Sequence, residues 1–428
     1  MKHVLIGASL FLAQLYFTFL GEARLDKYLN PVFLLSVSAA IPAYLIWLLL
    51  KHPRETVARA KPLLWHRAVW AFGGLISVLI AYEELRKAFV KYSEPSNWSD
   101  VLTQVRVLYE RFSHGEFPYD YIRIWDSYDL APVYMPLQWL PAGFAVAFEI
   151  DLRWIGFGFF AIAVAVYGWK LASQNGTIIS RVISLLLPSL PLWAYIRWGE
   201  IDLMVSFEIV VGAYYLILAT GLLSKRLWLV TFGIILCVLS RYTLVFWLPL
   251  FALNLFYDAG LKKTLWVWGS VAACVLLLYI IPFYIKDSAK INRGLSYYTM
   301  ATVAEWNGYG EPPVSWTHER GVSFAPHMKA LFHGDMESRV HNARIVQGVM
   351  LLLVFAGSLI GYRRWRNRID IYTFNLVALY CFLATYYFFA PLTYRYYLFS
   401  FLVFSAVLCG KIVMNEVKGN RELLDSLH

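Results

Sequence analysis

The residue best suited to do chemistry is Asp100, which follows an apolar segment directly and begins a polar, aromatic-rich stretch. Apolar residues recur at helical spacing over 101–113, which predicts an amphipathic helix at a membrane surface. Asp100 is a candidate N-cap of that helix, a role that Asp often fills. Ser99 can cap the helix as well, and the Asp100 carboxylate is then free to face a cavity. Burial would raise the pKa of this carboxyl group and suit it to act as a general base.

Two arginines stand inside apolar runs and are candidates for binding an anion. Arg241 interrupts the run LCVLSRYTLVFW, and Arg395 lies within PLTYRYYLFS. A charge inside a membrane segment needs a partner. A phosphate group is a natural one, because a guanidinium can bind it through two parallel hydrogen bonds. The alternative for both arginines is that the side chain extends to the membrane surface.

Acidic and aromatic side chains provide further candidates for contact with a substrate. Glu200 and Asp202 lie in RWGEIDLM between two apolar runs, where they either contact substrate or are solvated helix ends. The run GEFPYDYIRIWDSYDLAPVY includes Tyr119 and Tyr134 and is either an aromatic belt at the membrane interface or a platform for a sugar or prenyl chain. Neither its Asp residues nor the four cysteines show metal-ligand spacing, so no cofactor is predicted and a divalent metal is not indicated.

The composition predicts a protein embedded in a lipid bilayer. Hydrophobic residues make up 59% of the 428 residues and charged residues only 15%, whereas soluble domains carry about a quarter charged residues. The net charge of +10 does not indicate a nucleic-acid partner, because the Lys and Arg residues gather in short gaps between apolar runs. In such gaps they report membrane topology, so membrane lipids are the expected partners and nucleic acid is excluded.

Proline and charge together predict how the apolar segments cross the membrane. Pro132, Pro136 and Pro141 prevent a continuous helix over 132–149, so we expect this segment to enter the membrane and leave on the same side. About twelve crossings then remain, with both termini in the cytoplasm together with the basic gaps 51–67 and 363–368. The predicted spans are 4–20, 30–50, 68–90, 154–171, 178–198, 202–223, 226–240, 242–257, 264–284, 344–362, 371–389 and 393–414, of which 226–240 and 242–257 are short and expected to be tilted or to meet near Arg241.

The predicted fold is therefore an all-α polytopic membrane protein with an amphipathic helix in its first large outer loop, 91–153. Two N-terminal transmembrane helices (1–60) precede a membrane core (61–285) that contains this loop. An outer loop or lid (286–343) and the C-terminal transmembrane helices (344–428) follow. This topology puts most polar residues that charge rules do not explain on the outer face.

These features resemble the GT-C superfamily of membrane glycosyltransferases, and most closely the polyprenol-phosphate-mannose-dependent mannosyltransferase family. The resemblance covers about residues 68–285 and rests on Asp100, the amphipathic helix after it, and the Gly-x-Phe-Pro-Tyr segment 115–119. Three family elements are altered. The chain has Val133-Tyr134-Met135-Pro136 for Tyr-x-Tyr-Pro-Pro, Gly199-Glu200-Ile201-Asp202 for Gly-Gln-x-Asn, and Arg241-Tyr242 for Lys-Pro. A single acid, Asp100, replaces the paired acids of some relatives, and the two spans before residue 60 precede the usual first helix of that fold.

The resemblance implies an enzyme that moves a hexose or pentose, with inversion, from a polyprenyl-phosphate donor to a glycan or lipid acceptor. The reaction would take place at the outer face of a bacterial inner membrane. Asp100 would be the general base and the 285–343 loop would cover the cavity. The implied donor-phosphate ligands are Arg241 and Arg395, and the implied substrate contacts are Glu200, Asp202, Tyr119 and Tyr134.

Three alternatives stay open at the level of sequence. An enzyme of the O-antigen ligase or polymerase type also acts on lipid-linked glycans, and would use an Arg or His of the 285–343 loop. A lipid or sugar transporter would bind its substrate at broken helices near the membrane midplane. A purely structural membrane subunit would leave the polar outer loops unexplained.

Overall fold

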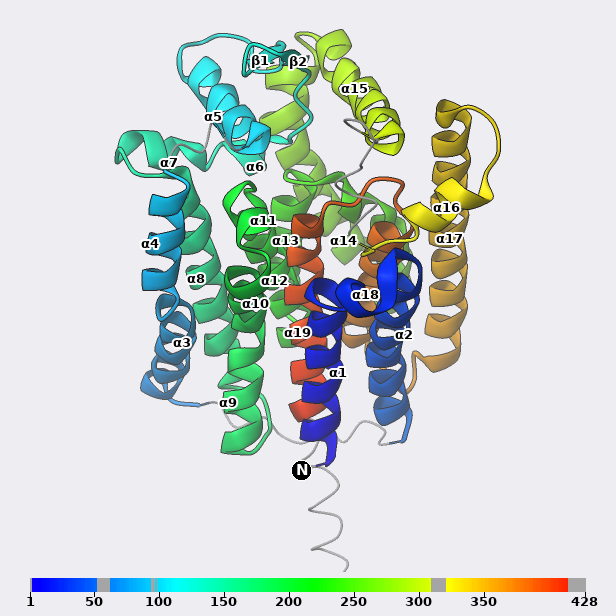
Figure 1. Cartoon of the computed structure of the whole chain (residues 1–428). Helices are drawn as coiled ribbons and strands as arrows, with labels where there is room; N and C mark the ends of the chain where they lie inside the picture. Colours follow the sequence, from blue (N-terminus) through cyan, green and yellow to red (C-terminus); the bar gives the residue numbers. More distant parts are fainter. Residues whose placement is uncertain (1, 52–61, 94–96, 98, 309–320, 415–428) are drawn as a thin grey trace, which may run out of the picture.

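The computed structural model describes residues 2–51, 62–93, 97, 99–308 and 321–414, and about 81% of the structure is helical. Long helices form a bundle, and short helices and a β-hairpin gather at one end, which we call the upper end (Figure 1). The N-terminus lies at the opposite, lower end. Within the described residues, the only strands are those of this hairpin, so the all-α prediction is confirmed. Residues 52–61 of the basic gap, His318 and residues 415–428 lie outside the described part.

The helices that cross the bundle, alone or in consecutive pieces, account for most of the structure. They are α1 (Lys2–Phe19), α2 (Glu22–Lys51), α3 (Leu64–Leu79), α4 (Tyr82–Lys91), α8 (Leu152–Leu171), α9 (Ile178–Leu186), α10 (Leu190–Trp198), α12 (Glu208–Ser224), α13 (Leu227–Val238), α14 (Leu248–Val275), α17 (Met336–Trp365), α18 (Ile371–Phe389) and α19 (Leu398–Met414). The remaining elements connect them. These are α5 (Asp100–Ser113), β1 (Ile122–Ile124), β2 (Tyr128–Leu130), α6 (Pro136–Trp139), α7 (Ala142–Ala147), α11 (Glu200–Met204), α15 (Ser288–Asn307), α16 (Ala325–Leu331), the 3₁₀ turns η2 (Leu187–Ser189), η3 (Tyr242–Phe246) and η6 (Arg395–Tyr397), and the π-helical η4 (Leu276–Tyr284).

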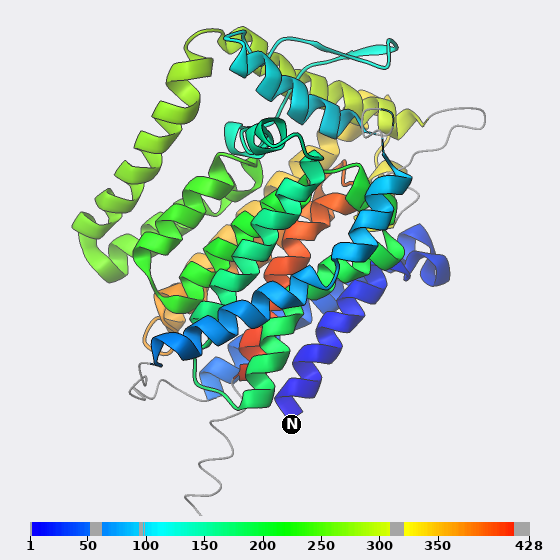
Figure 2. The same ribbon diagram turned by 90° about the vertical axis from the view of Figure 1, so that its left-hand side faces the viewer.

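Many of these helices are long and apolar enough to cross a membrane. By length and composition the described residues contain nine such segments, and α12 and α13 are shorter apolar helices. One of the nine, Leu248–Tyr284, is broken at Gly260, whose φ of 79° favours glycine. The chain reverses direction at this break, and the two parts move apart from there toward the upper end (Figure 2). The chain is thus a polytopic membrane protein, while the count of about twelve crossings stays a prediction.

The proline-rich segment 132–149 is not one helix, as its sequence predicts. It forms only α6 and α7, of four and six residues. Other elements satisfy its irregular backbone. The Leu137 N–H donates to the Leu239 carbonyl over 2.7 Å, and the Leu137 carbonyl accepts from the Tyr214 hydroxyl over 2.9 Å. Such external partners are what allow non-helical backbone inside a membrane protein.

Helix α5 confirms the predicted amphipathic helix and positions its first residue. The Ser99 Oγ accepts the Leu102 N–H over 3.0 Å, so Ser99 is the N-cap and Asp100 is the first helical residue. At the other end of α5, Arg111 donates to the carbonyls of Pro118, Asp120 and Tyr121. These bonds fix the chain that leads into the β1–β2 hairpin above the bundle (Figure 1).

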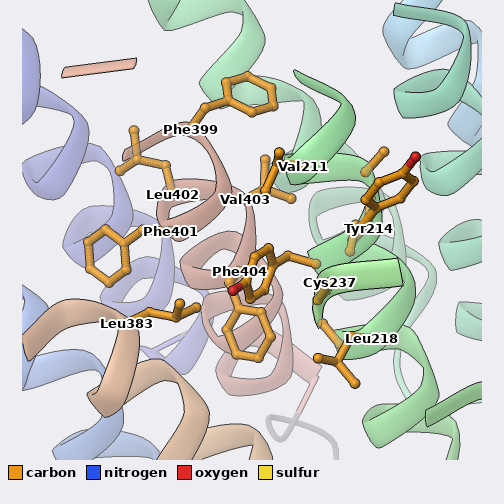
Figure 3. Packing of buried hydrophobic residues seen from close by; sticks show 14 of the residues in the cluster. Val211, Tyr214, Leu218, Cys237, Leu383, Phe399, Phe401, Leu402, Val403 and Phe404 are labelled. Atoms are coloured by element: carbon orange, nitrogen blue, oxygen red, sulfur yellow. The ribbon is translucent and has the colours of Figure 1, made fainter. Parts of the chain in front are cut away.

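The core of the bundle is built around α19, nearly all of whose residues are buried. Figure 3 shows Val403 and Phe404 on the side of α19 that faces Val211 of α12, and Phe401 on the side toward Leu383 of α18. Helices α1 and α2 also pack against α19, so the two N-terminal helices belong to the same core. A close-packed centre of this kind holds the loops at the upper end in fixed positions.

Glycine allows α3 and α8 to approach closely. A Cβ added to Gly168 of α8 would lie 2.3 Å from the carbonyl oxygen of Trp70 in α3. A Cβ on Gly74 of α3 would lie 2.7 Å from the Val164 carbonyl oxygen. Small residues at helix contacts let the backbones pack against each other, which drives helix association in membranes.

We predict that Gly168→Ala lowers the stability of the purified protein in detergent by about 1–3 kcal/mol, because the added methyl group overpacks the α3–α8 contact. The melting temperature measures the effect. Gly158→Ala on the same helix is the matched control, since nothing lies within 4 Å of the added Cβ. Equal melting temperatures for the two variants would contradict the close packing.

Candidate functional site

A cavity of about 340 Å³ lies at the upper end, and we call it the first cavity. The start of α5, the end of β2, α11, α15 and the 392–397 segment line it. Four of the sequence candidates, Asp100, Tyr134, Asp202 and Arg395, meet here, and they come from three distant parts of the chain. Its other lining residues are mainly aromatic or apolar, among them Tyr298, Tyr394 and Tyr397.

Asp100 is held in the wall of this cavity by a neighbour on the hairpin. The Tyr128 hydroxyl donates to the Asp100 Oδ2 over 3.1 Å. Burial raises the pKa of Asp100 above its ordinary value, and the hydrogen bond from Tyr128 partly opposes the rise. Because Ser99 provides the helix cap, the Asp100 side chain lines the cavity as predicted. A carboxylate in this environment can accept a proton from a bound hydroxyl group.

Asp202 and Arg395 form an ion pair in the same wall. The Arg395 Nε donates to the Asp202 Oδ2 over 2.8 Å, and the two side chains are 14% and 8% exposed. The Arg395 carbonyl also accepts the Tyr195 hydroxyl, which fixes the backbone of η6. Arg395 therefore does not extend to bulk solvent. Together the two side chains place one positive and one negative charge in the wall of the first cavity.

A second cavity of about 220 Å³ adjoins the first and contains Arg241. Gln138, η3 and the upper end of α18 contribute to its lining. The two cavities share part of one wall, so they lie next to each other. The shared lining residues are Val133, Tyr134, Tyr298, Leu392 and Tyr397.

Arg241 is also paired, with an acid that the sequence candidates did not include. Its Nη2 donates to the Oε1 of Glu208, the first residue of α12, whose side chain is only 1% exposed. The guanidinium lies 5.3 Å from the ring centre of Tyr134 and 4.7 Å from that of Tyr397. Such contacts stabilise a buried cation. The guanidinium is thus held at the wall that the two cavities share.

The structure separates two of the sequence candidates from both cavities. Glu200 points to Lys91 at the end of α4, 3.1 Å away, and lines neither cavity. Tyr119 is buried among aromatic rings, and its hydroxyl donates to the Tyr134 carbonyl over 3.0 Å. Tyr119 therefore supports the backbone of Tyr134, while Tyr134 itself lines both cavities.

Several site residues were not among the sequence candidates. Glu208 follows Phe207 inside the predicted span 202–223, and an acid in a membrane segment is a signal that could have identified it. Gln138 is fully buried in α6 and donates to Glu208 over 3.3 Å. Tyr298 and Tyr397 carry no comparable signal, because aromatic residues are common throughout this chain.

The described residues offer little for binding a metal ion. In the part of the chain that the structure covers, no three His, Cys, Asp or Glu side chains come together. Of the loop acids, Asp120 pairs with Lys290 and Asp129 with Arg123. The cavities present the Asp100 carboxylate, the Asp202–Arg395 pair, the Arg241 guanidinium and tyrosine rings. They thus offer charged hydrogen-bonding groups and flat apolar faces to a ligand.

Models of protein families, curated proteins and solved structures were each compared with this chain, and none of them matches it.

We predict that Tyr128→Phe raises the pKa of Asp100 further, because it removes the hydroxyl that stabilises the ionised carboxylate. Infrared titration of the carboxyl C=O band measures this, and Asp100→Asn identifies the band. Tyr121→Phe is the control, since this exposed residue precedes the same hairpin and lines neither cavity. An unchanged or lower pKa in Tyr128→Phe would show that the hydrogen bond does not act on Asp100.

Proposed function

We propose that this protein is an inverting glycosyltransferase that uses a polyprenyl-phosphate sugar as donor and a glycan or glycolipid hydroxyl as acceptor. One observation carries the proposal: a carboxylate with a raised pKa and a buried arginine lie in two cavities that share a wall. Inversion requires a nucleophile and a leaving group on opposite sides of the anomeric carbon. Two adjoining cavities, with a base in one and a cation in the other, provide that arrangement.

Each cavity has a part in the proposed reaction. The acceptor hydroxyl binds in the first cavity, where Asp100 takes its proton as the oxygen attacks the anomeric carbon. The sugar lies along the shared wall, where the rings of Tyr134, Tyr298 and Tyr397 offer flat apolar faces. The phosphate leaves in the second cavity as an anion next to Arg241, which stabilises the developing charge.

Arg395 has a different proposed role from Arg241. It shares the first cavity with Asp100 and is paired with Asp202. A paired arginine still has free N–H groups that can donate to polar groups of a ligand. We assign the Asp202–Arg395 pair to the acceptor, and Arg241 to the donor phosphate.

The lipid surroundings support access of a prenyl chain to the second cavity. Tyr242 and Phe246 of η3 line this cavity and are 38% and 44% exposed. We assign the exposed faces of these two side chains to the opening of the second cavity toward the bilayer. The prenyl chain of the donor would then lie along η3 and remain in the bilayer.

The charge distribution supports an outer location for both cavities. The Lys225–Asp370 pair joins the α12–α13 turn to the start of α18, and the basic 363–368 segment lies nearby at the lower end (Figure 1). Basic turns favour the cytoplasmic side. The lower end, with the N-terminus, would be cytoplasmic, and the cavities would open on the outer face of a bacterial inner membrane.

The structure offers less support for the alternatives. A ligase-type mechanism would use an Arg or His of the 285–343 segment; in its described part none lines either cavity, and His318 and Arg320 lie outside the described residues. The helix break at Gly260, where a transporter site would be sought, also lines neither cavity.

We predict that Asp100→Asn lowers the rate of sugar transfer at least ~100-fold, since the acceptor proton then has no base to accept it. The assay uses purified protein, radiolabelled polyprenyl-phosphate sugars and candidate glycan acceptors. The control is Asp120→Asn, which removes an acid of the same loop that pairs with Lys290 and lines neither cavity. Near-wild-type transfer by Asp100→Asn would remove Asp100 as the base.

Orientation is tested by cysteine labelling with a membrane-impermeant reagent in intact cells. We predict that Ser127→Cys in the hairpin is labelled from outside, while Asn175→Cys in the α8–α9 turn is labelled only after the membrane is opened. Both positions are exposed. The reverse pattern would put the cavities in the cytoplasm and contradict the proposed location.

A further inference from the structure

Glu208 is a buried acid that the proposed reaction leaves without a role. Its side chain is 1% exposed, and only its Oε1 atom has partners, namely Arg241 and Gln138. Among the described residues, the Glu208 Oε2 and the Gln138 Oε1 are buried without a hydrogen-bond partner. Leaving a buried polar atom without a hydrogen bond destabilises the fold. A carboxylate kept under these conditions calls for a functional explanation.

Only one member of the Arg241–Glu208 ion pair lines the second cavity. Arg241 and Gln138 line the cavity, whereas Glu208 lies behind them and does not. An anion that enters the cavity can contact Arg241 directly but meets Glu208 only through its charge. Glu208 therefore reduces the positive potential that the anion experiences without competing for the same space.

In the proposed reaction, a weaker positive potential at Arg241 would help the product to leave. The bond between the anomeric carbon and the phosphate oxygen breaks, and its electron pair stays on the phosphate, while the acceptor proton goes to Asp100. The donor is a phosphodiester with a single negative charge. The product is a prenyl phosphomonoester, which carries about −1.5 to −2 near neutral pH. A bare arginine in a buried cavity would hold this product more tightly than the donor.

We propose that Glu208 is a counter-charge that weakens the hold of Arg241 on a prenyl phosphomonoester, so that the product can leave. This inference rests on the proposed function and adds product release to it. In this role Glu208 is a positioning and charge-tuning residue that acts through Arg241 and does not contact the reacting atoms. The opposite possibility, that Glu208 only orients Arg241, predicts an effect of the opposite sign.

The test measures binding of a short-chain prenyl monophosphate to the full-length protein in detergent. With Glu208→Gln, which keeps an acceptor for Arg241 but removes the negative charge, we expect the dissociation constant to fall about tenfold or more. Under steady-state turnover kcat should fall, while the rate of a single turnover changes little. Inorganic phosphate is a second probe. Because the inferred effect acts on the phosphate charge, Glu208→Gln should bind it more tightly as well.

Asp370→Asn is the matched control, because it removes the charge of another paired acid at the far end of the bundle. It should leave prenyl monophosphate binding unchanged. Unchanged or weaker binding in Glu208→Gln would overturn the inference. If Glu208→Gln fails to fold, the double variant Glu208→Gln with Arg241→Gln, which leaves no buried charge unpaired, replaces it. That variant should lose binding of both phosphates, and retained binding would also overturn the inference.

The design separates this inference from the proposed function. Prenyl monophosphate binding needs no acceptor and no turnover, so it can be measured even if transfer is not detected. Loss of transfer in Asp100→Asn together with unchanged binding in Glu208→Gln would leave the glycosyltransferase proposal standing and remove only the role of Glu208.

Discussion

Charge pairing inside an apolar bundle is the constraint on which the site depends. Arg241 and Arg395 both lie near the upper end, mostly buried, and each is held by an acid from a distant part of the chain. An unpaired charge there would cost several kcal/mol. Glu208 thus ties η3 to α12, and Asp202 ties η6 to α11. The same ion pairs that offset the cost of burying these charges also set the geometry and net charge of the two cavities.

The irregular segments around the cavities are fixed in an analogous way, by hydrogen bonds to elements distant in sequence. The Val133 N–H donates to the Gln104 Oε1 of α5 over 3.1 Å, one helical turn beyond Asp100. Lys290 of α15 pairs with Asp120 in the loop that leads to the hairpin. Helix α5 thus presents Asp100 while also holding the backbone next to Tyr134. A site assembled in this manner is preorganised before any ligand binds.

Sequence alone could predict the parts of this structure that follow local rules. The helix after Ser99, the break of 132–149 at its prolines and the predominance of helix all depend on near neighbours. The meeting of Asp100, Asp202 and Arg395 in one wall agrees with the prediction that they lie on the same face of the membrane. The sequence marks Glu208 as an acid inside a predicted span, but its pairing with Arg241 could not be derived, because that depends on how the two segments pack. The orientation of Glu200 toward Lys91 also depends on how α4 packs beside α11.

The central claim is that the donor phosphate binds in one cavity while the catalytic base acts from the adjoining one. The most direct measurement is a cryo-electron microscopy structure of the wild-type protein with a non-hydrolysable prenyl phosphonate sugar. The account predicts that the phosphonate lies against Arg241 and the sugar along Tyr134 and Tyr397, with its anomeric carbon toward Asp100. A ligand bound elsewhere, or a phosphonate next to Asp100 and away from Arg241, would contradict it.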